Sequence, residues 1–211
     1  MGGGDKTFAP ILGKPLVAHT LDRFESSSLV DQIVLVLAED SLKRGRELAQ
    51  EQGYRKVTHV CAGGERRQDS VKNGLSLLSE CDWVMVHDGA RPCLDEAMLQ
   101  RGLDAAAEFG SAIAGVPVKD TIKLVSTGQM VTETPDRSLL WAAQTPQIFR
   151  YTLLSEAHRD CTQDVTDDAA MIESLGHPVK MFLGAFQNIK VTTAEDLIIA
   201  EEFLKSASSY I

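Results

Sequence analysis

The chain has 211 residues, a formal net charge of −9 and a hydrophobic content of 44%. This length is enough for one substantial core, so we expect a single domain over residues 1–211. The acidic balance argues against a general nucleic-acid-binding protein, because little positive charge is available to neutralise phosphates. No apolar run is long enough to span a membrane and no signal-peptide pattern opens the chain, so we expect a cytoplasmic protein with no membrane partner.

The hydrophobic pattern alternates between the periods of a strand and of a helix. Apolar runs predict strands at residues 32–38, 56–61, 83–86, 111–116 and 179–183. Helical patterns occur at residues 15–24, 40–52 and 95–109, from Arg150 onward and after Thr193. Such alternation favours an α/β fold with parallel strands and right-handed crossovers.

Two glycine-rich stretches could hold phosphate groups. Residues 2–4 are glycines, followed by Lys6; they suit a loop that wraps a phosphate, although a frayed terminus is the simpler interpretation. Gly63 and Gly64 follow the predicted strand at 56–61 and precede a helix, which places free backbone N–H groups beside a crevice. A glycine turn before a capped helix is the alternative for this second stretch.

A polar cluster follows the predicted strand at 83–86. The sequence there is His87-Asp88-Gly89-Ala90-Arg91-Pro92. Open α/β sheets bind their ligands at the carboxyl ends of such buried strands. The Asp88 carboxylate suits a hard cation such as Mg²⁺, and the Arg91 guanidinium suits a phosphate. An Asp–Arg pair that closes a loop is the alternative interpretation.

The region from 117 to 149 interrupts the strand–helix rhythm. Residues 118–125 and 130–134 predict two strands of a hairpin joined by a turn at 126–129. A hairpin has little core of its own, so it must pack either on its own domain or on a partner. Farther along, Thr166 precedes two acidic residues and suits the N-cap of a helix.

Several of these segments together resemble one family. The motif at 87–92 resembles the His-Asp-Ala-Ala-Arg-Pro signature of 2-C-methyl-D-erythritol 4-phosphate cytidylyltransferases, with Gly89 in place of the more usual alanine. Further segments resemble the family's motifs in the same order; these are residues 1–16, 62–71, 120–147, 166–169 and 188–192. The resemblance implies a single Rossmann-like, mostly parallel sheet with helices on both faces. It also implies a β-hairpin dimerisation arm at about 118–140 and therefore a homodimer.

The resemblance also implies a reaction and roles for individual residues. CTP and 2-C-methyl-D-erythritol 4-phosphate would give 4-diphosphocytidyl-2-C-methyl-D-erythritol and pyrophosphate, in the non-mevalonate isoprenoid pathway, with Mg²⁺ held by Asp88. Lys6 and Lys190 would be the catalytic cations. The nucleotide contacts would be Gly64, Glu65, Ser70, Asp88 and Ala90, with Arg67 orienting their loop. The sugar phosphate would contact Asp88, Arg91, Thr121, Arg137, Thr145, Thr166 and Lys190, of which Thr121, Arg137 and Thr145 would come from the neighbouring subunit.

The sequence departs from the family's pattern at its start. The family's first strand, most of its glycine-rich loop and the arginine of that loop have no counterpart here, and we expect the natural chain to begin upstream of Met1. Three alternatives stay open. One is a ribitol-5-phosphate cytidylyltransferase, and another is a uridylyl- or guanylyltransferase with the same fold. The third is a non-catalytic nucleotide-binding protein, which the missing loop would favour.

Overall fold

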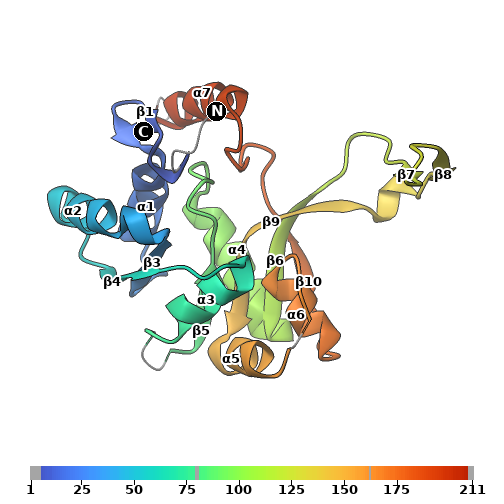
Figure 1. The fold of residues 1–211 in the computed structure, drawn as a ribbon, viewed down its shortest axis with the longest axis horizontal. Helices are drawn as coiled ribbons and strands as arrows, with labels where there is room; N and C mark the ends of the chain where they lie inside the picture. Colours follow the sequence, from blue (N-terminus) through green and yellow to red (C-terminus); the bar gives the residue numbers. More distant parts are fainter. Residues whose placement is uncertain (1–5, 79–80, 162, 209–211) are drawn as a thin grey trace.

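The computed structural model describes residues 6–78, 81–161 and 163–208 (Figure 1). The glycines at 2–4, for which a phosphate loop and a frayed terminus were the two interpretations, lie outside the described residues. The helices are α1 (Leu16–Ser26), α2 (Leu42–Gln52), α3 (Arg67–Leu75), α4 (Glu96–Phe109), α5 (Tyr151–Asp160), α6 (Asp168–Ser174) and α7 (Ala194–Ser208), with 3₁₀ turns η1 (Lys6–Phe8), η2 (Glu39–Ser41) and η3 (Arg137–Leu139). The strands are β1 (Pro10–Ile11), β2 (Lys14–Pro15), β3 (Ile33–Leu37), β4 (Val57–Ala62), β5 (Trp83–Val86), β6 (Ser111–Pro117), β7 (Leu124–Val125), β8 (Val131–Glu133), β9 (Trp141–Arg150) and β10 (Lys180–Leu183).

A four-stranded mixed sheet forms the centre of the molecule. Its strand order is β10-β6-β9-β5, with β10 parallel to β6 and β9 antiparallel to both of its neighbours. Helix α4 packs on one face, and α5 and α6 pack on the other (Figure 1). The fully buried Ile148 and Phe149 are adjacent in β9, so their side chains point to opposite faces and each contributes to a different hydrophobic cluster. The predicted α/β class is therefore confirmed.

Strand β9 was not predicted from the sequence. Residues 145–147 were expected only to lead into a helix from Arg150, whereas the structure has a ten-residue strand that ends at Arg150 and a helix that begins at Tyr151. Proline cannot donate to a ladder and is confined to edges and irregularities of sheets. Pro146 lies where the pairing of β6 with β9 is irregular, between the pairs Ile113–Gln147 and Gly115–Ala143. That local irregularity is what allows a proline inside a central strand.

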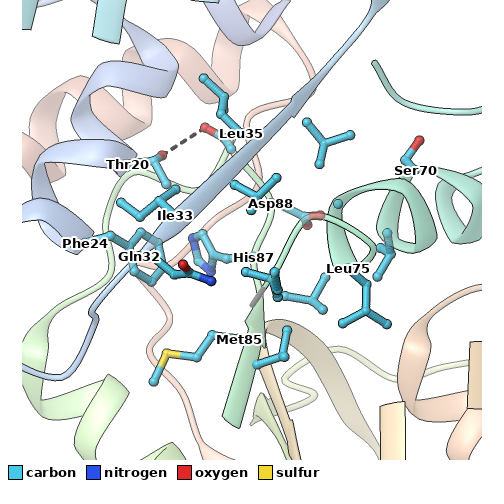
Figure 2. Close-up of a pocket in the computed structure, with 18 of the residues that line it drawn as sticks. Thr20, Phe24, Gln32, Ile33, Leu35, Ser70, Leu75, Met85, His87 and Asp88 are labelled. Atoms are coloured by element: carbon cyan, nitrogen blue, oxygen red, sulfur yellow. Dashed lines mark hydrogen bonds between the residues drawn. The ribbon is translucent and has the colours of Figure 1, made fainter. Parts of the chain in front are cut away.

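Strands β3 and β4 form a separate parallel pair packed against α1 and α2. Between β3 and β5 lies a cavity of about 920 Å³. Its lining is apolar along both strands, and Figure 2 shows Ile33, Leu35 and Met85 among these side chains. Within the described residues, β3 pairs only with β4, and β5 pairs only with β9. The cavity thus separates the two sheets, and its lining includes polar groups that follow the carboxyl ends of their strands.

The hairpin β7–β8 projects from the ends of β6 and β9 as an arm (Figure 1). The predicted hairpin is confirmed, although its strands are shorter than the patterns at 118–125 and 130–134 indicated. No helix in the described part of the chain is long and apolar enough to cross a membrane.

Two predicted helix starts have different outcomes. Thr193 begins α7 as expected, because its hydroxyl accepts from Asp196 N at 3.2 Å and its own N–H donates to the Asp196 carboxylate at 2.8 Å. The prediction of Thr166 as the N-cap of α6 is wrong. The cap is Asp167, whose carboxylate accepts from Ala170 N at 2.9 Å.

Candidate active site

The carboxyl end of β5 brings together one carboxylate and two cations. Asp88 Oδ2 lies 3.1 Å from Arg91 Nε and 3.2 Å from Lys190 Nζ. The side chain of Asp88 is 17% exposed and that of Arg91 is 12% exposed, whereas Lys190 is 46% exposed. Lys190 therefore reaches the solvent side of the cluster, where a charged substrate would approach. The cluster carries a formal charge of +1.

Hydrogen bonds to the backbone hold this cluster in place. Arg91 Nη1 donates to the Asn188 carbonyl at 2.9 Å, which ties the loop after β5 to the segment that carries Lys190. The same two segments pair through Val191 N and the Ala90 carbonyl at 2.9 Å. The arginine is thus oriented before any ligand binds, which lowers the entropic cost of binding.

A chain of polar groups beneath the cluster assigns the protonation state of His87. Asp88 N donates to Thr145 Oγ1 at 3.0 Å, and that hydroxyl lies 3.1 Å from His87 Nδ1. His87 Nε2 lies 3.1 Å from the Arg91 carbonyl, which can only accept, so Nε2 carries the proton and Nδ1 accepts from Thr145. The ring also packs edge-on against Phe24. Thr145 therefore contacts its own chain's loop after β5.

Burial and neighbouring charges shift two pKa values here. Burial lowers the pKa of His87 to about 4, so the ring is neutral at pH 7. For Asp88, burial opposes ionisation, but the charges of Lys190 and Arg91 outweigh it and hold the pKa of the carboxyl below its usual value. The site thus keeps an ionised carboxylate beside two cations.

Lys6 lies next to the same segment. Its Nζ donates to the carbonyl of Thr192, two residues beyond Lys190. The two lysines predicted as catalytic cations, Lys6 and Lys190, therefore lie near the same segment although they are far apart in the sequence. Ala90, predicted to contact the nucleotide, is partly buried against the hydrophobic cluster that includes Ile11 and Leu16, and its carbonyl accepts from Val191 N.

The Gly63–Gly64 loop borders the polar end of the cavity. Gly64 N donates to Ser70 Oγ at 3.0 Å, so the serine hydroxyl holds the loop closed (Figure 2 labels Ser70). A Cβ on Gly64 would lie 2.3 Å from the Asp69 Cβ, so no larger residue fits this turn. Ser70, Arg67 and Asp88 line the same cavity. Glu65 is exposed and does not line it.

The loop before α6 lies near this region, while the arm does not. Thr166 is exposed, and its neighbour Asp167 accepts from Gln147 Nε2 of β9 at 2.8 Å. Thr121 and Arg137 are exposed on the arm, where Arg137 Nη1 donates to the Lys119 carbonyl at 2.6 Å. In Figure 1 the arm extends away from the end of β5.

Sequence reasoning missed two residues that support the site. Asn188 is fully buried and donates to the Thr145 carbonyl at 2.8 Å, while its own carbonyl accepts from Arg91. His87 links Thr145 to the Arg91 backbone. Both lie inside motifs that the sequence analysis singled out. The available signal was that a polar side chain beside a buried strand must find hydrogen-bond partners.

These features define a class. An α/β fold with a glycine loop, an ionised carboxylate and clustered cations at strand ends is typical of nucleotide-binding enzymes that handle phosphates.

Comparison with known proteins narrows this class. Residues 1–206 match the family model of 2-C-methyl-D-erythritol 4-phosphate cytidylyltransferase. A relative of that name from Dehalococcoides mccartyi is 50% identical over 205 residues, which cover 97% of this chain and 90% of the relative. Another from Syntrophotalea carbinolica is 46% identical, covering 98% and 91%. The chain belongs to the 2-C-methyl-D-erythritol 4-phosphate cytidylyltransferase family.

Solved structures agree with this assignment. The 4-diphosphocytidyl-2C-methyl-D-erythritol synthase from Anaerococcus prevotii has a TM-score of 0.87 at 28% identity, covering 96% of this chain and 94% of that chain. The 2-C-methyl-D-erythritol 4-phosphate cytidylyltransferase from Thermus thermophilus has a TM-score of 0.79 at 30% identity, covering 96% and 95%. The similarity thus extends over nearly the whole fold.

Proposed function

We propose that the chain transfers the cytidylyl group of CTP to 2-C-methyl-D-erythritol 4-phosphate and releases pyrophosphate, in the non-mevalonate isoprenoid pathway. Membership of the family supports the substrates. The observation that carries the chemistry is the Asp88–Arg91–Lys190 cluster, where two cations share one buried carboxylate oxygen at a strand end. A ligand phosphate could therefore meet positive charge that is already positioned.

The reaction joins two anions, so charge neutralisation and positioning are its main requirements. A phosphate oxygen of the sugar phosphate attacks the α-phosphorus of CTP, and the bond from that phosphorus to the bridging oxygen of pyrophosphate breaks. No general base is needed, because the nucleophile is already an anion. In this proposal Arg91 orients the sugar phosphate, and Lys190 and Lys6 stabilise negative charge as the phosphorus becomes crowded.

We propose Mg²⁺ as the cofactor, held by Asp88 together with the phosphates of CTP. The donor set fits, because Mg²⁺ commonly takes one or two carboxylates and completes its shell with water and substrate phosphates. The described residues contain no group of three potential metal ligands, so Asp88 would be the principal protein ligand. When bound, the ion would withdraw charge from the leaving pyrophosphate.

We further propose that the arm at about 118–140 pairs two chains into a homodimer, in which Thr121 and Arg137 of one chain reach the cluster of the other. Apolar side chains lie exposed along the arm and beside it: Ile122, Leu124, Val125, Met130, Val131, Leu139 and Trp141. Exposed apolar side chains gathered on one element are typical of interaction surfaces. The whole chain would act as one nucleotidyltransferase domain in the cytoplasm.

The direct test is pyrophosphate release from CTP, Mg²⁺ and methylerythritol phosphate. It is run with the 211-residue chain and with a version preceded by a first strand and glycine-rich loop of the pattern that the resemblance implies for the family. Ribitol 5-phosphate replaces the sugar phosphate in one control, and UTP or GTP replaces CTP in another. Turnover with CTP and methylerythritol phosphate alone is the expected result. If neither version turns over any pair of substrates but the chain still binds CTP, the result would support a non-catalytic nucleotide-binding protein instead.

A further inference from the structure

The start of α3 is bound to the loop before α6 by several polar contacts. Arg67 Nη1 lies 2.6 Å from Asp168 Oδ2. Gln68 donates from Nε2 to the Gln163 carbonyl at 3.3 Å and accepts from Val165 N at 3.2 Å. These contacts join the glycine loop, residues 63–70, to residues 163–168, which include Thr166.

Asp168 is the centre of this junction. Its carboxylate is fully buried, and both of its oxygens are occupied: Oδ2 by Arg67 and Oδ1 by His158 Nε2 at 3.1 Å. Because a carboxylate oxygen can only accept, the histidine carries its proton on Nε2. Burial disfavours the charge of Asp168, but the His158 hydrogen bond and the Arg67 charge outweigh it and keep its pKa below the usual value. A buried ionised carboxylate that lost either partner would be strongly destabilised. Removing Arg67 or His158 should therefore disturb all three side chains.

Both ends of this junction reach the candidate active site. On one side, Arg67 lines the cavity beside Ser70. On the other side, Gln147 of β9 binds Asp167 at 2.8 Å and accepts from Ala169 N at 3.3 Å. Two residues before Gln147 in the same strand, Thr145 holds the backbone of Asp88. The segments predicted to hold the nucleotide and the sugar phosphate are therefore mechanically connected.

We propose that Arg67, Asp168 and His158 form a positioning network that couples CTP binding at residues 63–70 to sugar-phosphate binding at residues 163–168. This inference rests on the proposed function and adds a regulation of the same site. None of the three side chains needs to touch a substrate. When CTP binds at the glycine loop, any change in the position of Arg67 is passed through Asp168 to the loop that carries Thr166, so each substrate tightens the binding of the other.

Two substitutions of His158 distinguish a hydrogen-bonding role from a packing role. His158→Gln can keep a donor toward Asp168, whereas His158→Leu leaves the buried Oδ1 without a partner. In the proposal, His158→Gln retains most of the coupling and His158→Leu loses it. A histidine that served only as packing would give the reverse order, because leucine replaces the apolar bulk better.

The test has two arms with a shared control, Arg101→Gln, which removes an arginine outside the network that donates to the Leu183 carbonyl. In the first arm, amide hydrogen exchange of the ligand-free chain is measured. We expect Arg67→Gln to speed exchange in both 63–70 and 163–170, while Arg101→Gln leaves both segments unchanged. Unchanged exchange at 163–170 in Arg67→Gln overturns the proposal whether or not the chain is active.

In the second arm, initial rates are measured over a grid of both substrates. We expect the KM for CTP to fall about fivefold between low and saturating sugar phosphate in the unmodified chain, and to stay constant in Arg67→Gln. A variant that loses thermal stability yet keeps the fivefold change shows a purely structural role and overturns the proposal. If neither the 211-residue chain nor the extended version turns over, the proposed function fails, and the exchange measurement alone decides the network.

Discussion

The cluster at the end of β5 and the arm differ in how much of the chain supports them. Asp88 and Arg91 are largely buried: the Asp88 N–H donates to the Thr145 hydroxyl of β9, and the Arg91 guanidinium donates to the Asn188 carbonyl. Arg137 and Thr121 are exposed on a two-stranded hairpin whose strands are two and three residues long. A catalytic group must be held by packing to act. The arm residues can contribute to the reaction only if another surface holds them.

Among the substitutions that distinguish the cluster from the arm, Lys190→Ala is expected to change the activity most. Removing a cation that neutralises the reacting phosphates should lower kcat by a factor of about 10³. Because the side chain is 46% exposed, circular dichroism and thermal unfolding should change little. Lys43→Ala is a matched control, since Lys43 is 87% exposed and its ion pair is with the neighbouring Glu47. A kcat within threefold of normal would remove Lys190 from the mechanism.

The burial of His87 beneath the cluster also predicts that the folded chain loses stability in acid. The unfolded chain protonates His87 near pH 6.5, whereas the folded chain does so only near pH 4. Between these values the unfolded state binds more protons, so stability falls as pH falls, by about 3 kcal/mol across the window. Urea unfolding at pH 7 and pH 4.5 measures the loss, and His87→Gln should remove most of it. An equal pH dependence in the variant would contradict the lowered pKa of His87 in the folded chain.

The arm should respond in the opposite way, with little change in stability and a large change in association. Met130 and Val131 are 72% and 58% exposed, so their replacement by glutamate should hardly alter the thermal midpoint. The buried charge would instead oppose pairing of two chains and raise the dimer dissociation constant at least about tenfold. Analytical ultracentrifugation measures this, with Lys43→Glu as a control. Unchanged association would locate the dimer contact elsewhere.

Sequence patterns predicted the parts of the molecule whose signals are local. The apolar run at 83–86 forms β5, and the polar residues after it form the Asp88 cluster. The signals for the burial of this strand and for its end both lie within about ten consecutive residues. The start of the last helix after Thr193 was likewise a local signal, and hydrogen bonds between Thr193 and Asp196 form it. The sequence also indicated a hairpin, although only three-dimensional context decides how far its ladder extends.

What the sequence could not predict depends on distant partners. β9 contains Pro146, which by local rules argues against a central strand, and only its irregular pairing with β6 accommodates it. The network joins Arg67 to Asp168, which lie 101 positions apart, and Asp168 to His158, which lie 10 positions apart, and no spacing rule connects the three residues. Asp167 and Thr166 are both residue types that cap helices, so the sequence alone did not decide between them. The hydrogen bond from Gln147 to Asp167 favours the aspartate.

The central claim is that a complete site combines the cluster of one chain with the arm of another. Arg137→Ala and Lys190→Ala chains are each prepared, unfolded and refolded together, and assayed for pyrophosphate release. Each variant alone should be nearly inactive. The mixture should recover about a quarter of normal activity, because half of randomly formed dimers are mixed and each mixed dimer has one intact site. Activity in the mixture no higher than the average of the separate variants would contradict a shared site.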